Sequence, residues 1–329
     1  MKKVLLFILI CSASLLAQNP NLGTAGAQFL QIPVDAKNTA LGGAAVGLTN
    51  DASSIFWNPA GLANVNSVQA HFSYLRWFSM FDLNAAAVAY NIGDAGVIGA
   101  SLISFSTGEM EITTEEEPNG TGRFFDAQDI AVGISYSKFL TDRFSVGLTA
   151  KYVSQRIWNE TADGIAFDIG TQYRLDFQNL TIAMSMSNFG GDLRFDGPDL
   201  DITHNKDADY PQSRLTPARL QTESYPLPLN FQVGIGFDIY KADFVKIRGA
   251  IDAVHPNDNS ERLNFGTEFS FFDRLFLRGG YKYNYDDEKF AFGAGANLPF
   301  SGAAIFFDYA YSMFDILPSV HRISVGISF

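Results

Sequence analysis

The feature that most constrains this chain is an alternation of apolar with polar or small residues that recurs from Val68 to the end. In residues 322–329, Ile, Val and Phe alternate with Arg, Ser and Gly. Successive side chains of a strand point to opposite faces, so a period of two predicts strands lying between two different environments. Fourteen such strands are expected, beginning near Val68, Leu83, Val97, Asp129, Phe144, Gly164, Leu180, Leu229, Val245, Leu263, Leu275, Phe290, Ala304 and His321.

The connections between these segments alternate in length. Short turns are expected at residues 93–94, 141–142, 176–178, 241–243, 273–274 and 300–302. Longer loops are expected at residues 107–128, 159–163, 188–228, 255–262, 284–289 and 312–320, whereas the short, apolar connection 76–81 fits this alternation less well. A soluble sandwich has no reason to sort its loops in this way. The pattern predicts an all-β, transmembrane antiparallel β-barrel of 14 strands in a bacterial outer membrane, with both termini in the periplasm.

The composition agrees with a barrel that contacts lipid. The chain is 47% hydrophobic and 14% aromatic, with 29 glycines, yet no internal apolar run is long enough for a transmembrane helix. Aromatic residues flank several short turns, which suits the level of the lipid headgroups: Phe139, Phe144, Tyr173, Phe177, Tyr240, Phe244, Phe272 and Phe276. The formal charge of −12 argues against a nucleic-acid partner.

The first residues have the form of a secretory signal peptide. Met1-Lys2-Lys3 is followed by an apolar run and the small residue Ala17, so residues 1–17 are expected to be removed. Residues 67–329 form the expected barrel, and residues 18–66 are expected to be a periplasmic or lumenal plug. The mature chain would contain no cysteine, because Cys11 is the only one.

The expected plug centres on residues 35–64, which are rich in Ala and Gly. Gly42 and Gly43 permit a turn or a close approach to another surface. The plug motif ends in Trp57, Asn58, Pro59 and Ala60, in which Asn before Pro is a helix-start signal. The alternative is a short capped helix that leads into the first strand.

Charges of both signs are expected on the lumen face of the strands. They form either salt bridges that fill the lumen and hold a plug, or a transverse field across an open pore. The positions are Lys151, Asp168, Arg174, Asp238, Lys246, Arg248, Asp252, Glu268, Arg278, Lys282, Asp308 and Arg322.

Signatures of chemistry are weak. The histidines are scattered, and no nucleophile elbow or phosphate-binding glycine loop occurs, so no catalytic, cofactor or metal site is predicted. His71 and Ser73 share a strand face, which suits lumen polarity better than catalysis. Acidic clusters at residues 115–117 and 286–288 suit solvated loop tips better than calcium sites.

The two longest loops are polar. Residues 107–128 carry several glutamates, and residues 188–228 contain five prolines between Pro198 and Pro228. Loops of this length are usually functional or disordered. Their hydrophilicity favours a protein-binding surface over a site for fatty molecules.

Several segments together resemble the amino-terminal signature of the PorV/PorQ family, within the FadL-like group of outer-membrane barrels. They are residues 27–30, 35–37, 40–44, 51–52 and 56–62, with the Asn-Pro-Ala motif of the group at Asn58-Pro59-Ala60. The resemblance implies fourteen strands, an amino-terminal plug and a role near type IX secretion components and client proteins. The final Phe329 is similar to the signal that the bacterial barrel-insertion machinery recognises.

These observations lead to a non-enzymatic barrel, associated with type IX secretion, that binds or shuttles client or attachment proteins through its external loops. The alternative is a FadL-like channel for small hydrophobic compounds, in which the apolar tip at residues 77–81 helps to capture the ligand. A purely structural barrel is a third possibility.

Overall fold

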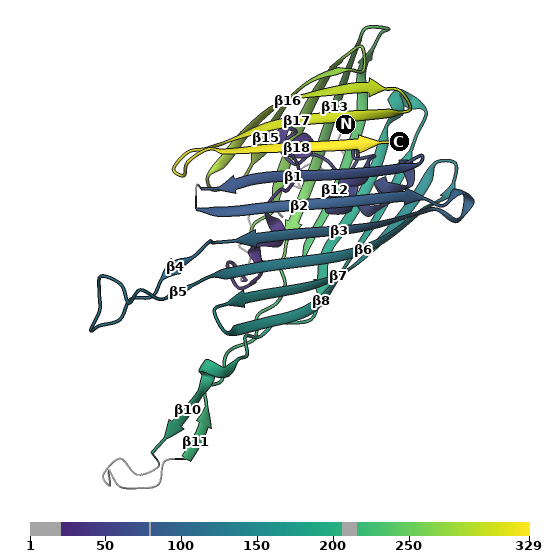
Figure 1. Cartoon of the computed structure of the whole chain (residues 1–329). Helices are drawn as coiled ribbons and strands as arrows, with labels where there is room; N and C mark the ends of the chain where they lie inside the picture. Colours follow the sequence, from purple (N-terminus) through teal and green to yellow (C-terminus); the bar gives the residue numbers. More distant parts are fainter. Residues whose placement is uncertain (1–20, 79, 206–215) are drawn as a thin grey trace, which may run out of the picture.

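The computed structural model describes residues 21–78, 80–205 and 216–329. The expected signal peptide, residues 1–17, lies outside the described residues. Fourteen antiparallel strands close into a barrel in which β1 pairs with β18 (Figure 1). They are β1 (Val68–Trp77), β2 (Phe81–Asn91), β3 (Val97–Ser106), β6 (Ala127–Thr141), β7 (Phe144–Ile157), β8 (Glu160–Arg174), β9 (Thr181–Gly190), β12 (Asn230–Lys241), β13 (Val245–Pro256), β14 (Arg262–Phe271), β15 (Leu275–Tyr283), β16 (Glu288–Phe300), β17 (Ala303–Phe314) and β18 (Val320–Ser328). The predicted fourteen-stranded antiparallel barrel is confirmed.

One predicted loop is wrong. Residues 159–163 were expected to form a long connection, but β7 continues to Ile157 and β8 begins at Glu160. Ile157 pairs with Glu160, and Ser154 pairs with Asp163. The polar side chains of this region belong to the paired ends of β7 and β8, and β8 runs past its last ladder partner in β9, so polarity alone did not mark a loop.

The two faces of the wall follow the alternation. Ile134 and Ile323 are 71% and 54% exposed on the outer face, whereas Thr149 and Ser324 are almost fully buried on the inner face. An outer face of large apolar side chains suits lipid contact, because lipid tails replace water there.

Most of the expected aromatic residues near the short turns lie on the outer face. Phe177 and Phe272 are 73% and 70% exposed, and the rings of Phe244 and Phe272 lie 6.5 Å apart. Phe276 was expected to join them, and it does not. Its neighbours Leu275 and Leu277 point outward, so Phe276 faces the lumen, beneath the Arg278 guanidinium at 5.1 Å.

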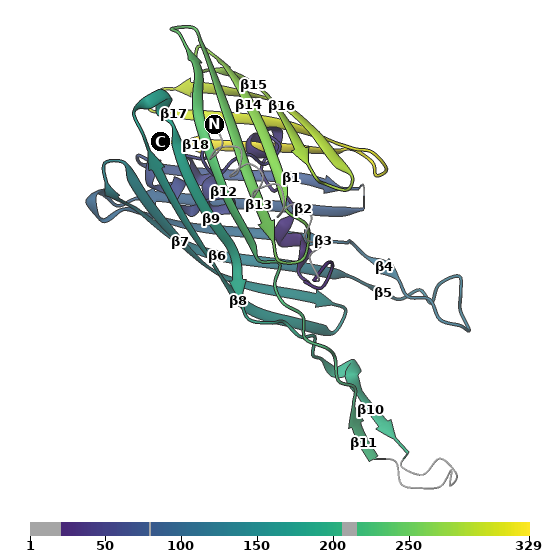
Figure 2. The same cartoon turned by 180° about the vertical axis from the view of Figure 1, so that it is seen from behind.

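The two longest loops form hairpins that project from the same end of the barrel (Figures 1 and 2). The first contains β4 (Met110–Glu111) and β5 (Phe124–Phe125). The second contains the 3₁₀-helix η7 (Pro198–Leu200), β10 (Asp201–His204) and β11 (Thr216–Arg219). We call this end the long-loop end; at the opposite, short-turn end two further 3₁₀-helices lie in the turns, η5 (Gly93–Ala95) and η6 (Phe177–Asn179).

Residues 21–66, here called the N-terminal segment, lie inside the barrel (Figure 1). They form the 3₁₀-helices η2 (Gln28–Gln31), η3 (Ala52–Phe56) and η4 (Pro59–Asn64) and the α-helix α2 (Ala36–Ala40). Helix α2 packs against β15–β18, and η4 packs against β6–β8. Among the described residues no helix is long and apolar enough to cross a membrane.

Candidate functional site

Each short helix in the middle of the N-terminal segment begins at an Asp or Asn side chain. Asp35 accepts a hydrogen bond from the Asn38 amide at 2.9 Å, and Asp51 forms a capping box with Ser54. Asn58 caps η4, with Pro59 in its first turn. Such caps satisfy amide groups that a helix start leaves free. Helices of five or six residues are not stable alone in water, so they depend on the barrel wall.

Asn58 is fully buried and connects three parts of the molecule. Its Oδ1 accepts from the Ala60 amide at 3.1 Å, which forms the cap. Its Nδ2 donates to the carbonyls of Val46, in the segment, and Thr171, in β8, each at 3.1 Å. The Ala60 carbonyl in turn accepts from Ser137 and Ser145, at 3.2 and 3.1 Å. Asn58, Pro59 and Ala60 therefore attach η4 to β6, β7 and β8.

Gly42 and Gly43 lie at the other side of the lumen. Both have positive φ, +67° and +76°, which glycine adopts without strain. A Cβ on Gly280 of β15 would lie only 2.0 Å from the Gly42 amide nitrogen, so glycine on both surfaces allows the two backbones to touch. The Gly43 carbonyl accepts from the Gln232 side chain at 3.0 Å.

Trp57 links the two parts of the plug motif. Its indole N–H donates to the Asp35 carboxylate, and its carbonyl accepts from Ser185 at 2.8 Å. Asp35 is fully buried, and this burial raises the pKa of its carboxyl, against the charge of His71 and the amide and indole donors. The six expected motif residues thus contact two separate stretches of wall, β6–β9 and β12–β15. Phe329 lies at the far end of the chain, where its amide donates to the Val68 carbonyl at 3.0 Å.

Inward-pointing side chains of the wall hold the middle of the segment; Asp252 was predicted as a lumen charge, whereas the sequence reasoning did not assign Gln172. Gln172 donates to the carbonyls of Val46 and Thr49, at 2.9 and 3.0 Å. Asp252 accepts from the Ala45 and Val46 amides, at 2.7 and 3.1 Å. Each of these residues is a large polar side chain at a lumen-facing strand position, which the sequence does show. No pattern along the chain predicts which backbone group such a side chain binds.

The predicted lumen charges pair with each other or with the segment, which confirms the salt-bridge interpretation. Glu268 lies between Arg248 and Arg278, and Arg278 also reaches Asp308 at 2.5 Å. The other ion pairs are Lys151–Asp168, Lys246–Asp238 and Lys282–Glu288. The remaining three, Arg174, Asp252 and Arg322, bind Asn64, Ala45 and Pro33 of the N-terminal segment.

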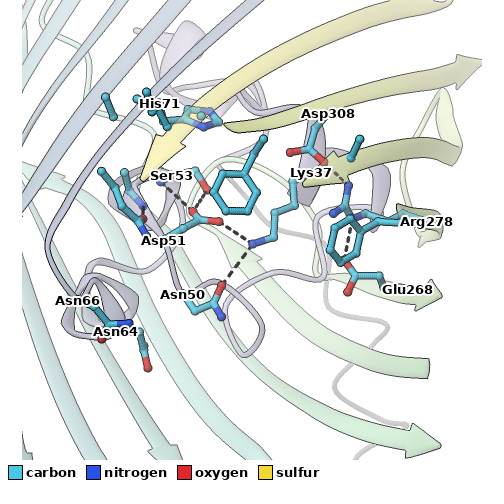
Figure 3. Close-up of a pocket in the computed structure, with 18 of the residues that line it drawn as sticks. Lys37, Asn50, Asp51, Ser53, Asn64, Asn66, His71, Glu268, Arg278 and Asp308 are labelled. Carbon is cyan, nitrogen blue, oxygen red and sulfur yellow. Dashed lines mark hydrogen bonds and ion pairs between the residues drawn. The ribbon is translucent and has the colours of Figure 1, made fainter. Parts of the chain in front are cut away.

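Two cavities lie on opposite sides of the segment. The one at the short-turn end has a volume of about 330 Å³ and is charged (Figure 3). Its wall includes Lys37, Asp51, His71, Arg248, Glu268, Arg278 and Asp308. The one at the long-loop end has a volume of about 700 Å³ and a mixed lining. Its apolar side chains include Phe29, Leu30, Ile32, Trp57, Trp77, Phe105 and Phe314, and its charged ones include Asp129, Arg262, Lys282 and Glu288.

The weaker candidates for chemistry have structural partners. His71 and Ser73 are hydrogen-bonded at 3.0 Å, and Ser73 also contacts Ser324 of β18. Asp287 accepts from the amides of Ile316 and Leu317, and Glu288 pairs with Lys282. Within the described ranges, no group of three or more His, Cys, Asp or Glu side chains is placed to hold a metal ion.

A family model described as type IX secretion system protein PorV matches residues 16–196, more than half of the chain. The chain belongs to the PorV family. The matched region covers the N-terminal segment and the first seven wall strands. No curated protein matches this PorV-family chain.

Solved structures support the fold of this PorV-family chain. The Pseudomonas putida toluene transporter TodX is 12% identical with a TM-score of 0.55, covering 89% of this chain and 97% of its own. The Ralstonia pickettii toluene transporter TbuX is 13% identical with a TM-score of 0.54, over 89% and 96% of the two chains. A Pseudomonas aeruginosa FadL homologue is 12% identical with a TM-score of 0.51, over 91% and 98%. At this identity the likeness establishes an outer-membrane barrel of FadL-like fold.

Proposed function

We propose that this PorV-family barrel binds client or attachment proteins of type IX secretion at the cell surface and has no enzymatic role. In this proposal the long-loop end faces outward and the carboxyl terminus lies in the periplasm, as in other outer-membrane barrels. The expected periplasmic position of the amino terminus is not part of the proposal, because the Gly23 amide donates to the Asp258 carbonyl at the long-loop end. The N-terminal segment is a plug that stays in the lumen, so partners bind to the outside of the barrel.

The projecting hairpins are the observation that carries this proposal. Of the described residues, 107–126 and two stretches of the second loop, 191–205 and 216–229, connect wall strands at the long-loop end, where both hairpins project (Figure 2). The first hairpin carries Glu109, Glu111 and three successive glutamates at residues 115–117. Such acidic, polar hairpins offer hydrogen-bonding edges and charge to a protein surface, and they offer little to an apolar solute.

The test is capture of secreted proteins by the tagged barrel from its own host in mild detergent. Replacing residues 109–124 by a short Gly-Ser turn should reduce capture of client proteins at least tenfold. The matched control replaces the three glutamates at residues 115–117 by glutamine, which keeps the hairpin and tests its charge. Full capture by the hairpin deletion would contradict this site of binding.

The aromatic part of the larger cavity favours one alternative, uptake of small hydrophobic compounds. The cavity's 700 Å³ would hold a small ligand, and the aromatic tip near Trp77 and Phe81 lies at its wall. A compound leaving this cavity toward the periplasm would meet the charged cavity on the other side of the segment. Two results would support uptake. The first is saturable binding of an aromatic hydrocarbon that is lost when Phe105 is replaced by Asp. The second is entry of the hydrocarbon into vesicles that contain the barrel.

A further inference from the structure

We propose that the N-terminal segment closes the barrel: it connects the first and last strands and brings them together during assembly. We call the pairing of β1 with β18 the closing seam. The inference concerns how the barrel forms, and it does not depend on what the finished barrel binds.

Four cross-strand pairs form the lumen side of the closing seam. They are Gln69–Ser328, His71–Gly326, Ser73–Ser324 and Leu75–Arg322. The segment binds three of the four pairs through its backbone. Gln69 accepts from the Ala52 amide at 3.1 Å, and Ser324 accepts from the Ala36 amide at 2.9 Å. Arg322 donates to the Pro33 carbonyl at 2.9 Å, and the fourth pair lines the charged cavity.

Two of these contacts involve side chains that already bond across the seam. Gln69 donates to Ser328 at 3.3 Å, and the hydroxyls of Ser73 and Ser324 are hydrogen-bonded. Each polar pair from β1 and β18 thus holds one amide of the segment. Apolar contacts add to them, because Phe29 and Val34 belong to one buried cluster with Leu75 of β1 and Val320 of β18.

The segment also attaches to the wall on both sides of the seam. Helix α2 packs against β15–β18, where Ala40 lies close to Gly293, while η3 packs against β1–β3. The two helices are joined by the Lys37–Asp51 ion pair at 2.6 Å (Figure 3). The walls on either side of the seam are therefore connected through a short chain of contacts.

Chain topology gives this connection a role in assembly. The two seam strands begin about 250 residues apart in sequence, so their pairing is the least local in the barrel, and closing so long a loop has a large entropic cost. The segment runs directly into β1 while carrying the groups that bind Arg322 and Ser324. Binding of β18 to the segment therefore raises the local concentration of β18 beside β1.

The test uses the mature chain, refolded from denaturant into detergent micelles. The closed barrel is followed by its heat-sensitive migration on gels. Deleting residues 21–64 should reduce the closed fraction at least tenfold.

A disulfide introduced by H71C and G326C joins the seam pair that the segment does not bind. Directly paired positions on neighbouring strands are close enough for disulfide geometry. Oxidised in denaturant before refolding, this disulfide should restore closure of the deleted chain, and reduction should abolish the rescue.

Two variants with the segment intact separate closure from general stability. S324A with Q69A removes contacts of the segment at the seam together with two side-chain bonds across it, whereas S137A with S145A removes contacts at β6 and β7. The same S324A and Q69A changes in the chain that lacks residues 21–64 measure the bonds across the seam alone. In the intact chain they should slow closure several-fold more than they do in the deleted chain, and several-fold more than S137A with S145A. Equal slowing, normal closure of the deleted chain, or failure of the oxidised disulfide to restore closure would each overturn the proposal.

Discussion

At the residue scale, neighbouring glycines of β15 have opposite surroundings. Gly280 faces the lumen, where a Cβ would lie 2.0 Å from the Gly42 amide nitrogen. Gly279 faces outward, where a Cβ would have only an ordinary contact at 3.9 Å with Phe292. We expect Gly280→Ala to destabilise the folded barrel by about 1–3 kcal/mol, as overpacking does, and Gly279→Ala to have almost no effect. Thermal unfolding of both variants in detergent checks this, and equal midpoints would contradict the close packing of Gly42.

Asp51 makes the stability of the N-terminal segment depend on pH. Burial opposes ionisation of Asp51, but the ammonium of Lys37 outweighs it and holds the pKa of Asp51 below its usual value. A lowered pKa stabilises the folded state above the unfolded pKa of about 4, and this stabilisation is lost as the pH falls further. Asp51→Asn should therefore lower the midpoint of thermal unfolding at pH 7, and its difference from the parent should shrink below pH 4. A difference independent of pH would show that the ion pair does not contribute.

At the element scale, η4 depends on both functions of Asn58. Asn58→Ser keeps a capping oxygen but loses the donors to Val46 and Thr171, and Asn58→Ala loses both. The cap is worth about 1 kcal/mol, so the alanine variant should loosen the segment more than the serine variant. Single-channel recordings in planar bilayers should give rising conductance from parent to serine to alanine. Unchanged conductance in both variants would remove the assignment of the segment as a plug.

The last strand offers a second prediction for an element. Phe329 contributes a backbone bond to Val68 and a side chain that is 60% exposed. If the side chain is an insertion signal, Phe329→Ala should impair delivery to the outer membrane although the backbone bond remains. Phe329→Tyr should behave like the parent. The amount of protein in the outer-membrane fraction measures this, and normal assembly of the alanine variant would argue against the signal.

At the scale of the whole molecule, the segment lies between a charged cavity and a larger one that is partly lined by aromatic side chains. Groups from β12, β13, β8 and β18 bind its backbone, so it could leave the lumen only by losing contacts at many strands together. We expect the parent barrel to show little steady conductance, because the segment occupies the lumen between the two cavities. Stable conductance of porin size in the unmodified protein would contradict a closed lumen.

The sequence by itself determined the strands, most of their faces and the start of η4. Alternation with a period of two is a property of one strand, and the cap at Asn58 acts within two residues, so both are visible along the chain. Only the tertiary structure decided which groups meet. The network from Arg248 through Glu268 to Arg278, and the attachment of Pro33 and Ala36 to β18, join residues far apart in sequence. Such contacts depend on strand register and on closure of the barrel, and no local pattern contains either.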